Sequence, residues 1–85
     1  MIFSKELRDR RQKKGMSLRE AEKRTNHAIS YSMLSRYERG LRLDRMSVRH
    51  AQAISKLFRW NFKDMSEKIA LEVAEQQGAT HAATA

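Results

Sequence analysis

The sequence predicts an all-α domain of five short helices, and three observations support this fold class. The 85 residues include no proline and only three glycines, so few positions interrupt a helix. Helix-favouring residue types such as Leu, Ala, Glu, Lys, Arg, Gln and Met are abundant. Apolar residues recur three and four positions apart, in segments that serines precede and glycines follow.

The first two helices are expected before residue 26. A helix over about residues 4–14 would begin with Ser4 as its cap and end at Gly15. Ser17 and Glu20 have the spacing of a capping box, in which each side chain bonds the backbone amide of the other residue. A second, short helix is therefore predicted to start at residue 16 or 17.

The third predicted helix has two contrasting sides. A turn at Asn26 and His27 leads to this helix, about residues 31–39, which begins after Ser30 and ends at Gly40. Its inner side is apolar and consists of Met33, Leu34 and Tyr37. Its outer arc is polar and basic and consists of Tyr31, Ser32, Ser35, Arg36 and Arg39. The outer arc contains no acid.

Two further helices and a tail complete the predicted chain. The fourth helix is capped near Ser47, and its predicted inward residues are Val48, Ala51, Ile54, Leu57 and Phe58. The fifth is expected over about residues 63–77 and ends at Gly78. One domain is therefore predicted over residues 1–77, followed by a flexible, disordered tail over residues 78–85, whose small side chains bury little surface.

The charge of the chain is concentrated in its first two-thirds. Residues 1–59 hold 16 Lys or Arg and 6 Asp or Glu, whereas residues 60–85 hold 2 and 4, which together give the net charge of +8. A folded basic face attracts polyanions, because each neutralised phosphate releases a condensed counterion. The same charge also suits a merely solvated surface, so charge alone does not identify the polyanion.

Two segments together resemble a known family. Gly15-Met16-Ser17-Leu18-Arg19-Glu20-Ala21 and Ile29-Ser30-Tyr31-Ser32-Met33-Leu34-Ser35-Arg36-Tyr37-Glu38-Arg39-Gly40 are similar to the Cro/CI-type (XRE) helix-turn-helix regulators of phages and bacteria. The resemblance covers about residues 3–65. It implies a five-helix, lambda-repressor-like DNA-binding domain whose third helix enters the major groove of an operator, and hence a transcriptional regulator, a repressor in our interpretation.

The resemblance also implies roles for individual residues. The base-reading residues would be Tyr31, Ser32, Arg36 and Ser35, with Arg36 suited to pair with guanine O6 and N7. The backbone-binding residues would be Ser17, Arg19, Ser30, Arg39, Arg42, Arg45, Arg10, Lys13 and Lys14, although each cation could equally be an idle surface charge. Glu38 would form a structural salt bridge with Arg11. The turn before the third helix is about two residues longer than is usual in the family.

The last third of the chain suggests protein partners. An apolar stripe predicted to form a homodimer interface comprises Trp60, Phe62, Met65, Ile69 and Val73, with packing inside one chain as the alternative. An alternative function is a protein-interaction module, such as an antitoxin, that binds a partner through the fifth helix and the tail.

Several classes of site are not expected. The chain has no cysteine, and His27, His50 and His81 lack metal-ligand spacing, so we predict no metal and no cofactor. No nucleophile motif or carboxylate pair suggests an enzyme. No apolar run suggests a membrane span or a secretory signal, so a cytoplasmic location is expected.

Overall fold

The computed structural model describes the backbone of residues 1–84 and the side chains of residues 1–78, and the described residues form helices and turns without a strand. The elements in chain order are α1 (Phe3–Lys13), α2 (Leu18–Arg24), α3 (Tyr31–Glu38), the 3-10 helix η1 (Leu43–Arg45), α4 (Val48–Phe58) and α5 (Phe62–Thr84). The prediction of an all-α domain with five α-helices is confirmed.

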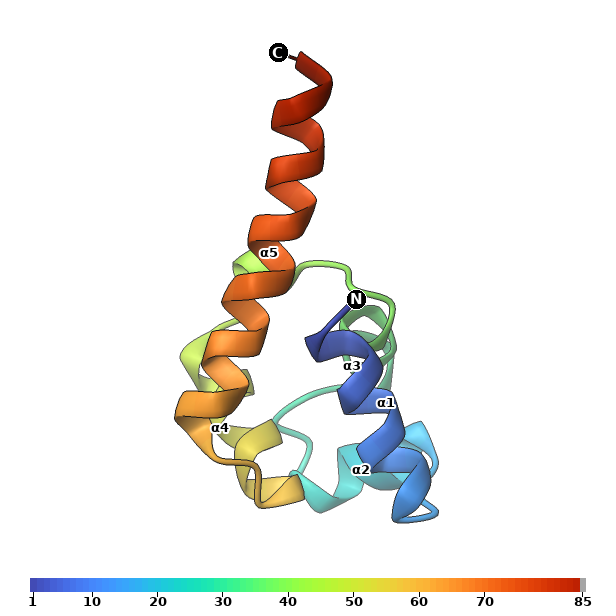
Figure 1. The fold of residues 1–85 in the computed structure, drawn as a ribbon. Helices are drawn as coiled ribbons and strands as arrows, with labels where there is room; N and C mark the ends of the chain where they lie inside the picture. Colours follow the sequence, from blue (N-terminus) through green and yellow to red (C-terminus); the bar gives the residue numbers. More distant parts are fainter. Residues whose placement is uncertain (85) are drawn as a thin grey trace.

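The helices enclose one core beneath the projecting end of α5 (Figure 1). In the tertiary packing, α3 lies against α1 and α2, while α5 packs on α1, α4 and η1. Every element contributes to the buried hydrophobic residues, which are Phe3, Leu7, Met16, Ala21, Ile29, Leu34, Tyr37, Leu43, Ala51, Ile54, Phe58, Trp60 and Met65. The helix-turn-helix pair therefore rests on a core supplied from both ends of the chain.

Serine side chains cap the N-termini of three helices, as the sequence predicts. The hydroxyl oxygens of Ser17, Ser30 and Ser47 accept hydrogen bonds from the amide three residues later, at 3.1, 3.2 and 3.1 Å. Each bond satisfies an amide that has no partner within its helix. Only half of the predicted capping box at Ser17 is seen, because the Glu20 carboxylate accepts instead from Arg24, at 3.2 Å.

The predicted cap of the first helix is wrong. Ser4 lies inside α1, and its amide and hydroxyl both donate to the carboxylate of Glu72, at 2.9 and 2.7 Å. The amide of Ile2 also donates to Glu72, at 3.1 Å. The start of α1 is therefore satisfied by a buried carboxylate from α5 rather than by a local serine.

Two other predictions for the helices need correction. Val48 is the first residue of α4 and 67% exposed, because the inward stripe of this helix begins one turn later. Helix α5 spans Phe62–Thr84 and so passes the predicted end at Gly78. The predicted flexible tail falls mainly on residues 79–85, which lie outside the residues whose side chains are described.

Candidate nucleic-acid interface

Helix α3 presents one polar side to solvent. Leu34 and Tyr37 turn into the core and are 1% and 2% exposed. Tyr31, Ser32 and Arg36 are exposed, and Ser35 is half-buried between the two sides. The predicted base-reading side chains thus lie on the outer arc of a single short helix, whose inner side anchors it to the domain.

Glu38 is removed from this outer arc by an ion pair inside the protein. Its carboxylate accepts from Arg11 Nε at 2.6 Å and from Arg11 Nη2 at 3.0 Å, while Arg11 Nη1 donates to the carbonyl oxygen of Met16. Glu38 is only 4% exposed, and its hydrogen bond raises the pKa of the Arg11 guanidinium. The pair links α1 to α3 and keeps negative charge off the outer side of α3.

The inner side of α3 also makes a polar contact with α4. The Tyr37 hydroxyl lies 2.7 Å from Nδ1 of His50, and the two rings meet edge to face. Burial raises the pKa of the Tyr37 hydroxyl, so it stays neutral near pH 7. Together with the Arg11 pair, this contact fixes α3 against helices on both sides.

The predicted backbone-binding residues occupy several elements around α3. Arg19 on α2 is exposed, and its guanidinium lies over the ring of Tyr31, 4.3 Å from the ring centroid. Arg39, the C-cap of α3, is exposed and donates from Nε to the Ser35 carbonyl oxygen at 3.4 Å. Ser17 and Ser30 are exposed caps at the starts of α2 and α3.

A basic loop leads from α3 to the start of α4. Arg42 takes a left-handed conformation, with φ of 60°, directly before η1, and Arg45 ends this short helix. Both side chains are exposed. Ser47 then caps α4, so these two cations directly precede in the chain a helix N-terminus, where the helix dipole favours an anion.

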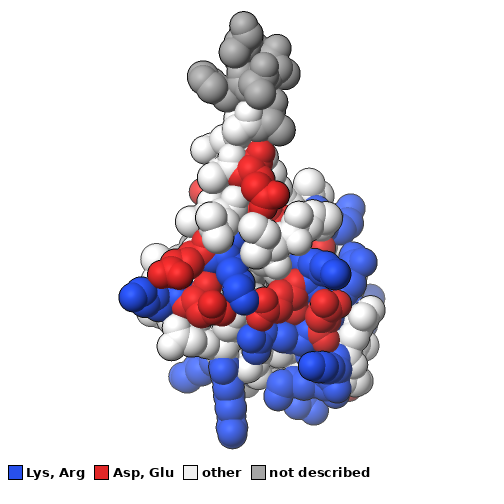
Figure 2. Space-filling model, viewed as in Figure 1, with Lys and Arg blue, Asp and Glu red and all other residues white. Residues whose placement is uncertain are grey.

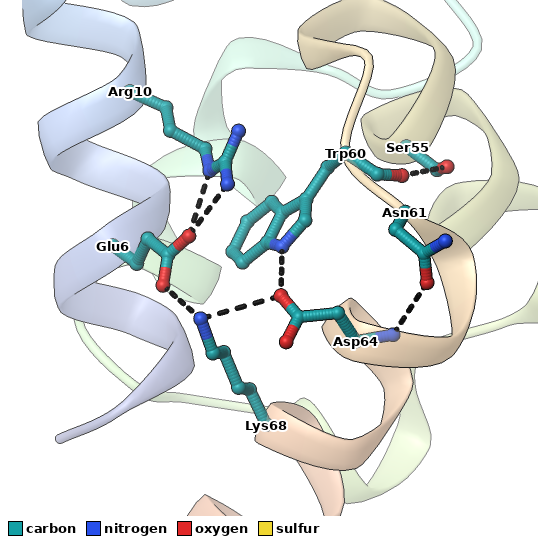
Figure 3. Close-up of polar contacts among 7 residues, drawn as sticks. All are labelled: Glu6, Arg10, Ser55, Trp60, Asn61, Asp64 and Lys68. Carbon is teal, nitrogen blue, oxygen red and sulfur yellow. Dashed lines mark hydrogen bonds and ion pairs between the residues drawn. The ribbon is translucent and has the colours of Figure 1, made fainter.

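The three cations predicted to bind DNA from the end of α1 differ in their partners. Lys13 and Lys14 are exposed, whereas Arg10 donates to Glu6 at 2.9 Å and stacks over the indole of Trp60 at 4.2 Å. Figure 3 shows Arg10 drawn into this cluster between α1 and α5. Its charge is balanced within the protein, which leaves Lys13 and Lys14 as the free cations of that group.

The cluster around Trp60 is structural in character. The indole Nε1 donates to Asp64 at 2.9 Å, and Lys68 bridges Asp64 and Glu6 at 3.3 and 2.6 Å (Figure 3). The hydrogen bond from Trp60, followed by that from Lys68, lowers the pKa of Asp64. These contacts fasten the first turns of α5 to α1.

Basic side chains dominate one end of the surface seen in Figure 2. The lower end of the body carries Lys and Arg, whereas Asp and Glu lie across its middle, interspersed with other Lys and Arg, and along α5. No helix in the described part of the chain is long and apolar enough to cross a bilayer. Among the residues with described side chains, no group of three or more His, Asp or Glu could hold a metal ion.

A family model described as helix-turn-helix matches residues 7–59, which is more than half of the chain. The chain belongs to the helix-turn-helix family. It is a Cro/CI-type member of the XRE group, as its sequence motifs indicated, and the family is one of DNA-binding transcription regulators. Searches of curated proteins and of solved structures gave no match.

Within this helix-turn-helix domain, the residues predicted to form a dimer interface separate into two groups. Trp60 and Met65 are 2% and 0% exposed, so the core of a single chain already buries them and they offer no surface to a second copy. Phe62 is 43% exposed, and Ile69 and Val73 are half-buried. Only this second group remains available for contact between copies.

The contacts of Glu22 and His27, which hold the turn between α2 and α3, were not predicted from the sequence. Glu22 on α2 accepts a hydrogen bond from the amide of Tyr31 at 2.8 Å and contacts Nδ1 of His27 at 2.6 Å. The available signal was the longer turn, because a turn with extra residues needs contacts that hold it in place. Glu22 itself has no distinguishing local pattern.

Proposed function

We propose that this helix-turn-helix protein is a sequence-specific repressor that acts in the bacterial or phage-infected cytoplasm by occupying an operator. The observation that carries this proposal is the outer side of α3, where exposed Tyr31, Ser32 and Arg36 stand together while Glu38 is buried against Arg11. A side that combines donors, acceptors and positive charge without an acid is complementary to the major groove.

Each exposed side chain of α3 has chemistry suited to a base edge. The guanidinium of Arg36 can donate two parallel hydrogen bonds to O6 and N7 of guanine. The hydroxyl of Ser32 can donate or accept, and the ring of Tyr31 can contact a thymine methyl group. We therefore assign Arg36 the largest share of base discrimination.

Phosphate binding is assigned to the elements that frame α3. Arg19, Arg39, Arg42 and Arg45 are exposed on the helices and the loop next to it. Such contacts fix the position of a protein on the duplex without reading its sequence. Lys13 and Lys14 are assigned the same role from the end of α1.

Selection from a pool of random duplexes tests this function directly. The wild-type chain should enrich one sequence, and its affinity should fall steeply with salt. Arg36→Ala should lose about 1 to 3 kcal/mol of binding free energy and relax preference at one base pair, whereas Arg42→Ala should weaken all sequences alike and lower the salt slope by about one. Lys5→Ala is the matched control. Lys5 is an exposed cation to which no DNA contact is assigned, and its neighbour Ser4 contacts α5. An enriched motif that is unchanged in Arg36→Ala would contradict the assigned role of Arg36.

We further propose a homodimer that forms through α5. The support is the end of this helix that projects from the body (Figure 1) together with the exposed or half-buried Phe62, Ile69, Leu71 and Val73. A two-fold dimer would place two copies of α3 about 34 Å apart, one turn of DNA, and bind a palindrome. Sedimentation at micromolar concentration should show a species twice 10.0 kDa, and a monomer alone would rule out a DNA-independent dimer.

A second candidate function is binding of a protein partner, in the manner of an antitoxin, through α5 and the tail. The projecting end of α5 favours it (Figure 1), and Leu71 on this helix is 55% exposed. An open hollow of about 640 Å³ beside Phe62, between the α2–α3 turn and α4, adds a concave surface. This reading predicts that no duplex is enriched and that binding to DNA, if any, is independent of sequence.

A further inference from the structure

The turn between α2 and α3 holds two consecutive residues in the left-handed conformation. Asn26 has φ of 55° and His27 has φ of 62°. Asn and His tolerate this region better than most residues, but it still costs free energy for any side chain. The backbone of the turn is closed by bonds from Asn26 N to the Lys23 oxygen and from His27 N to the Glu22 oxygen, at 2.9 and 3.0 Å.

The carboxylate of Glu22 joins this turn to the first residue of α3. One oxygen accepts from the amide of Tyr31 at 2.8 Å, and the other lies 2.6 Å from Nδ1 of His27. The amide of Tyr31 is one of the helix-start donors that have no partner inside α3. The hydrogen bond from His27, followed by that from the Tyr31 backbone, lowers the pKa of Glu22, so this carboxylate is ionised near neutral pH.

Tyr31 is held from a second side by its ring. The guanidinium of Arg19 lies 4.3 Å from the ring centroid, and the positive charge of Arg19 also acts on the carboxylate of Glu22. Two residues of α2 thus hold Tyr31, because Glu22 binds its backbone amide and Arg19 contacts its ring. Tyr31 stands at the start of the outer arc of α3, so its placement affects how that arc meets the bases.

We propose that Glu22 is a positioning residue that sets the orientation of Tyr31 and the first turn of α3. The inference rests on the proposed function, which it deepens by naming a residue that determines specificity. Glu22 acts through Tyr31 and is not itself a contact to DNA.

The contact between His27 and Glu22 supports the same role. Nδ1 of His27 lies 2.6 Å from the carboxylate oxygen that does not accept from Tyr31. The ring therefore holds the carboxylate in the orientation in which its other oxygen accepts from the Tyr31 amide.

The first arm of the test compares Glu22→Gln with Glu20→Gln. Both changes remove one negative charge from α2, but Glu20 is exposed and its carboxylate pairs with Arg24 on its own helix. The measured quantity is the affinity for the duplex enriched from the random pool divided by the affinity for random duplexes. Loss of an exposed charged hydrogen bond should lower this ratio about fivefold in Glu22→Gln. Glu20→Gln should leave the ratio unchanged.

The second arm measures the same ratio in His27→Asn, which removes the ring that contacts Glu22 and keeps a residue type that tolerates the left-handed turn. The ratio should fall, but by less than in Glu22→Gln, because the carboxylate and its hydrogen bond from the Tyr31 amide remain. In the free protein, the amide proton resonance of Tyr31 should shift from its wild-type position in Glu22→Gln and not in Glu20→Gln.

The outcomes separate this inference from the proposed function. A wild-type chain that enriches no sequence overturns the proposed function, and the inference falls with it. A wild type that enriches a sequence, while Glu22→Gln keeps the same ratio, overturns the inference alone. Each variant should unfold thermally within a few degrees of the wild type. A loss of the affinity ratio then reflects a change in the position of Tyr31 and α3 and not unfolding of the protein.

Discussion

The ion pair between Arg11 and Glu38 leads to a prediction whose size follows from its burial. Glu38→Ala leaves the guanidinium of Arg11, which is 15% exposed, without the two carboxylate oxygens that it contacts at 2.6 and 3.0 Å. Removing one partner of a buried pair costs about 3 to 5 kcal/mol, because the other charge stays desolvated and unpaired. The carbonyl of Met16 remains as a partner of Arg11, which favours the lower part of this range.

This cost is large for so small a domain. At roughly 0.05 to 0.15 kcal/mol per residue, 85 residues have a free energy of unfolding of about 4 to 13 kcal/mol. Each kcal/mol lost lowers the melting temperature by about 4 to 8 °C in a domain of this size. Glu38→Ala should therefore melt more than about 12 °C below the wild type.

Urea unfolding followed by circular dichroism measures the loss. Glu20→Ala is the matched control, because its pair with Arg24 joins side chains that are 46% and 56% exposed and should change stability by less than about 1 kcal/mol. Replacing both Arg11 and Glu38 by Met and Leu should recover part of the loss, since no lone charge then remains buried. A Glu38→Ala variant within about 1 kcal/mol of the wild type would refute the claim that this pair is buried and mutually dependent.

Two other predictions concern glycine substitutions at two helix ends and the acid stability of the contact between Glu6 and Lys68. Gly15→Ala and Gly40→Ala should each lose about 1 to 2 kcal/mol in urea unfolding, since both glycines have positive φ. Gly40→Ala should lose more, because its Cβ would lie 2.8 Å from the buried carboxylate of Glu72, whereas the space at Gly15 is open; equal losses would contradict this. Burial raises the pKa of Glu6, but hydrogen bonds led by Lys68 outweigh it and lower the pKa. A lowered folded-state pKa contributes stability above the unfolded value of about 4.3, and this is lost as pH falls through the folded value. The free energy of unfolding, measured as a function of pH, should show this loss below about pH 4, and the loss should be smaller in Lys68→Met. The same pH dependence in both proteins would argue against the contact between Glu6 and Lys68.

The helix starts and the two sides of α3 could be predicted because they depend on neighbouring residues. The hydroxyls of Ser17, Ser30 and Ser47 bond amides three residues ahead, so their partners are set by helix geometry alone. The division of α3 follows equally from 3.6 residues per turn. The resemblance to the family then connected the polar side of α3 with DNA binding.

The tertiary structure decided the contacts whose partners are distant in the chain. Glu72 bonds Ser4 across 68 residues and replaces the predicted local cap, because the packing of α5 brings a buried carboxylate to the start of α1. Arg10 was predicted to bind the DNA backbone, and its guanidinium stacks on the indole of Trp60, a residue distant in the chain. Its sequence neighbours contain no sign of that packing.

Sequence by itself thus determined the helices, the acid-free arc and the family of this protein. Only the tertiary structure decided which polar groups on those helices meet one another, including Glu22 and the amide of Tyr31. The reason is physical: a helix and its cap are set by contacts within one turn, whereas the partner of an exposed carboxylate or guanidinium depends on how whole helices pack.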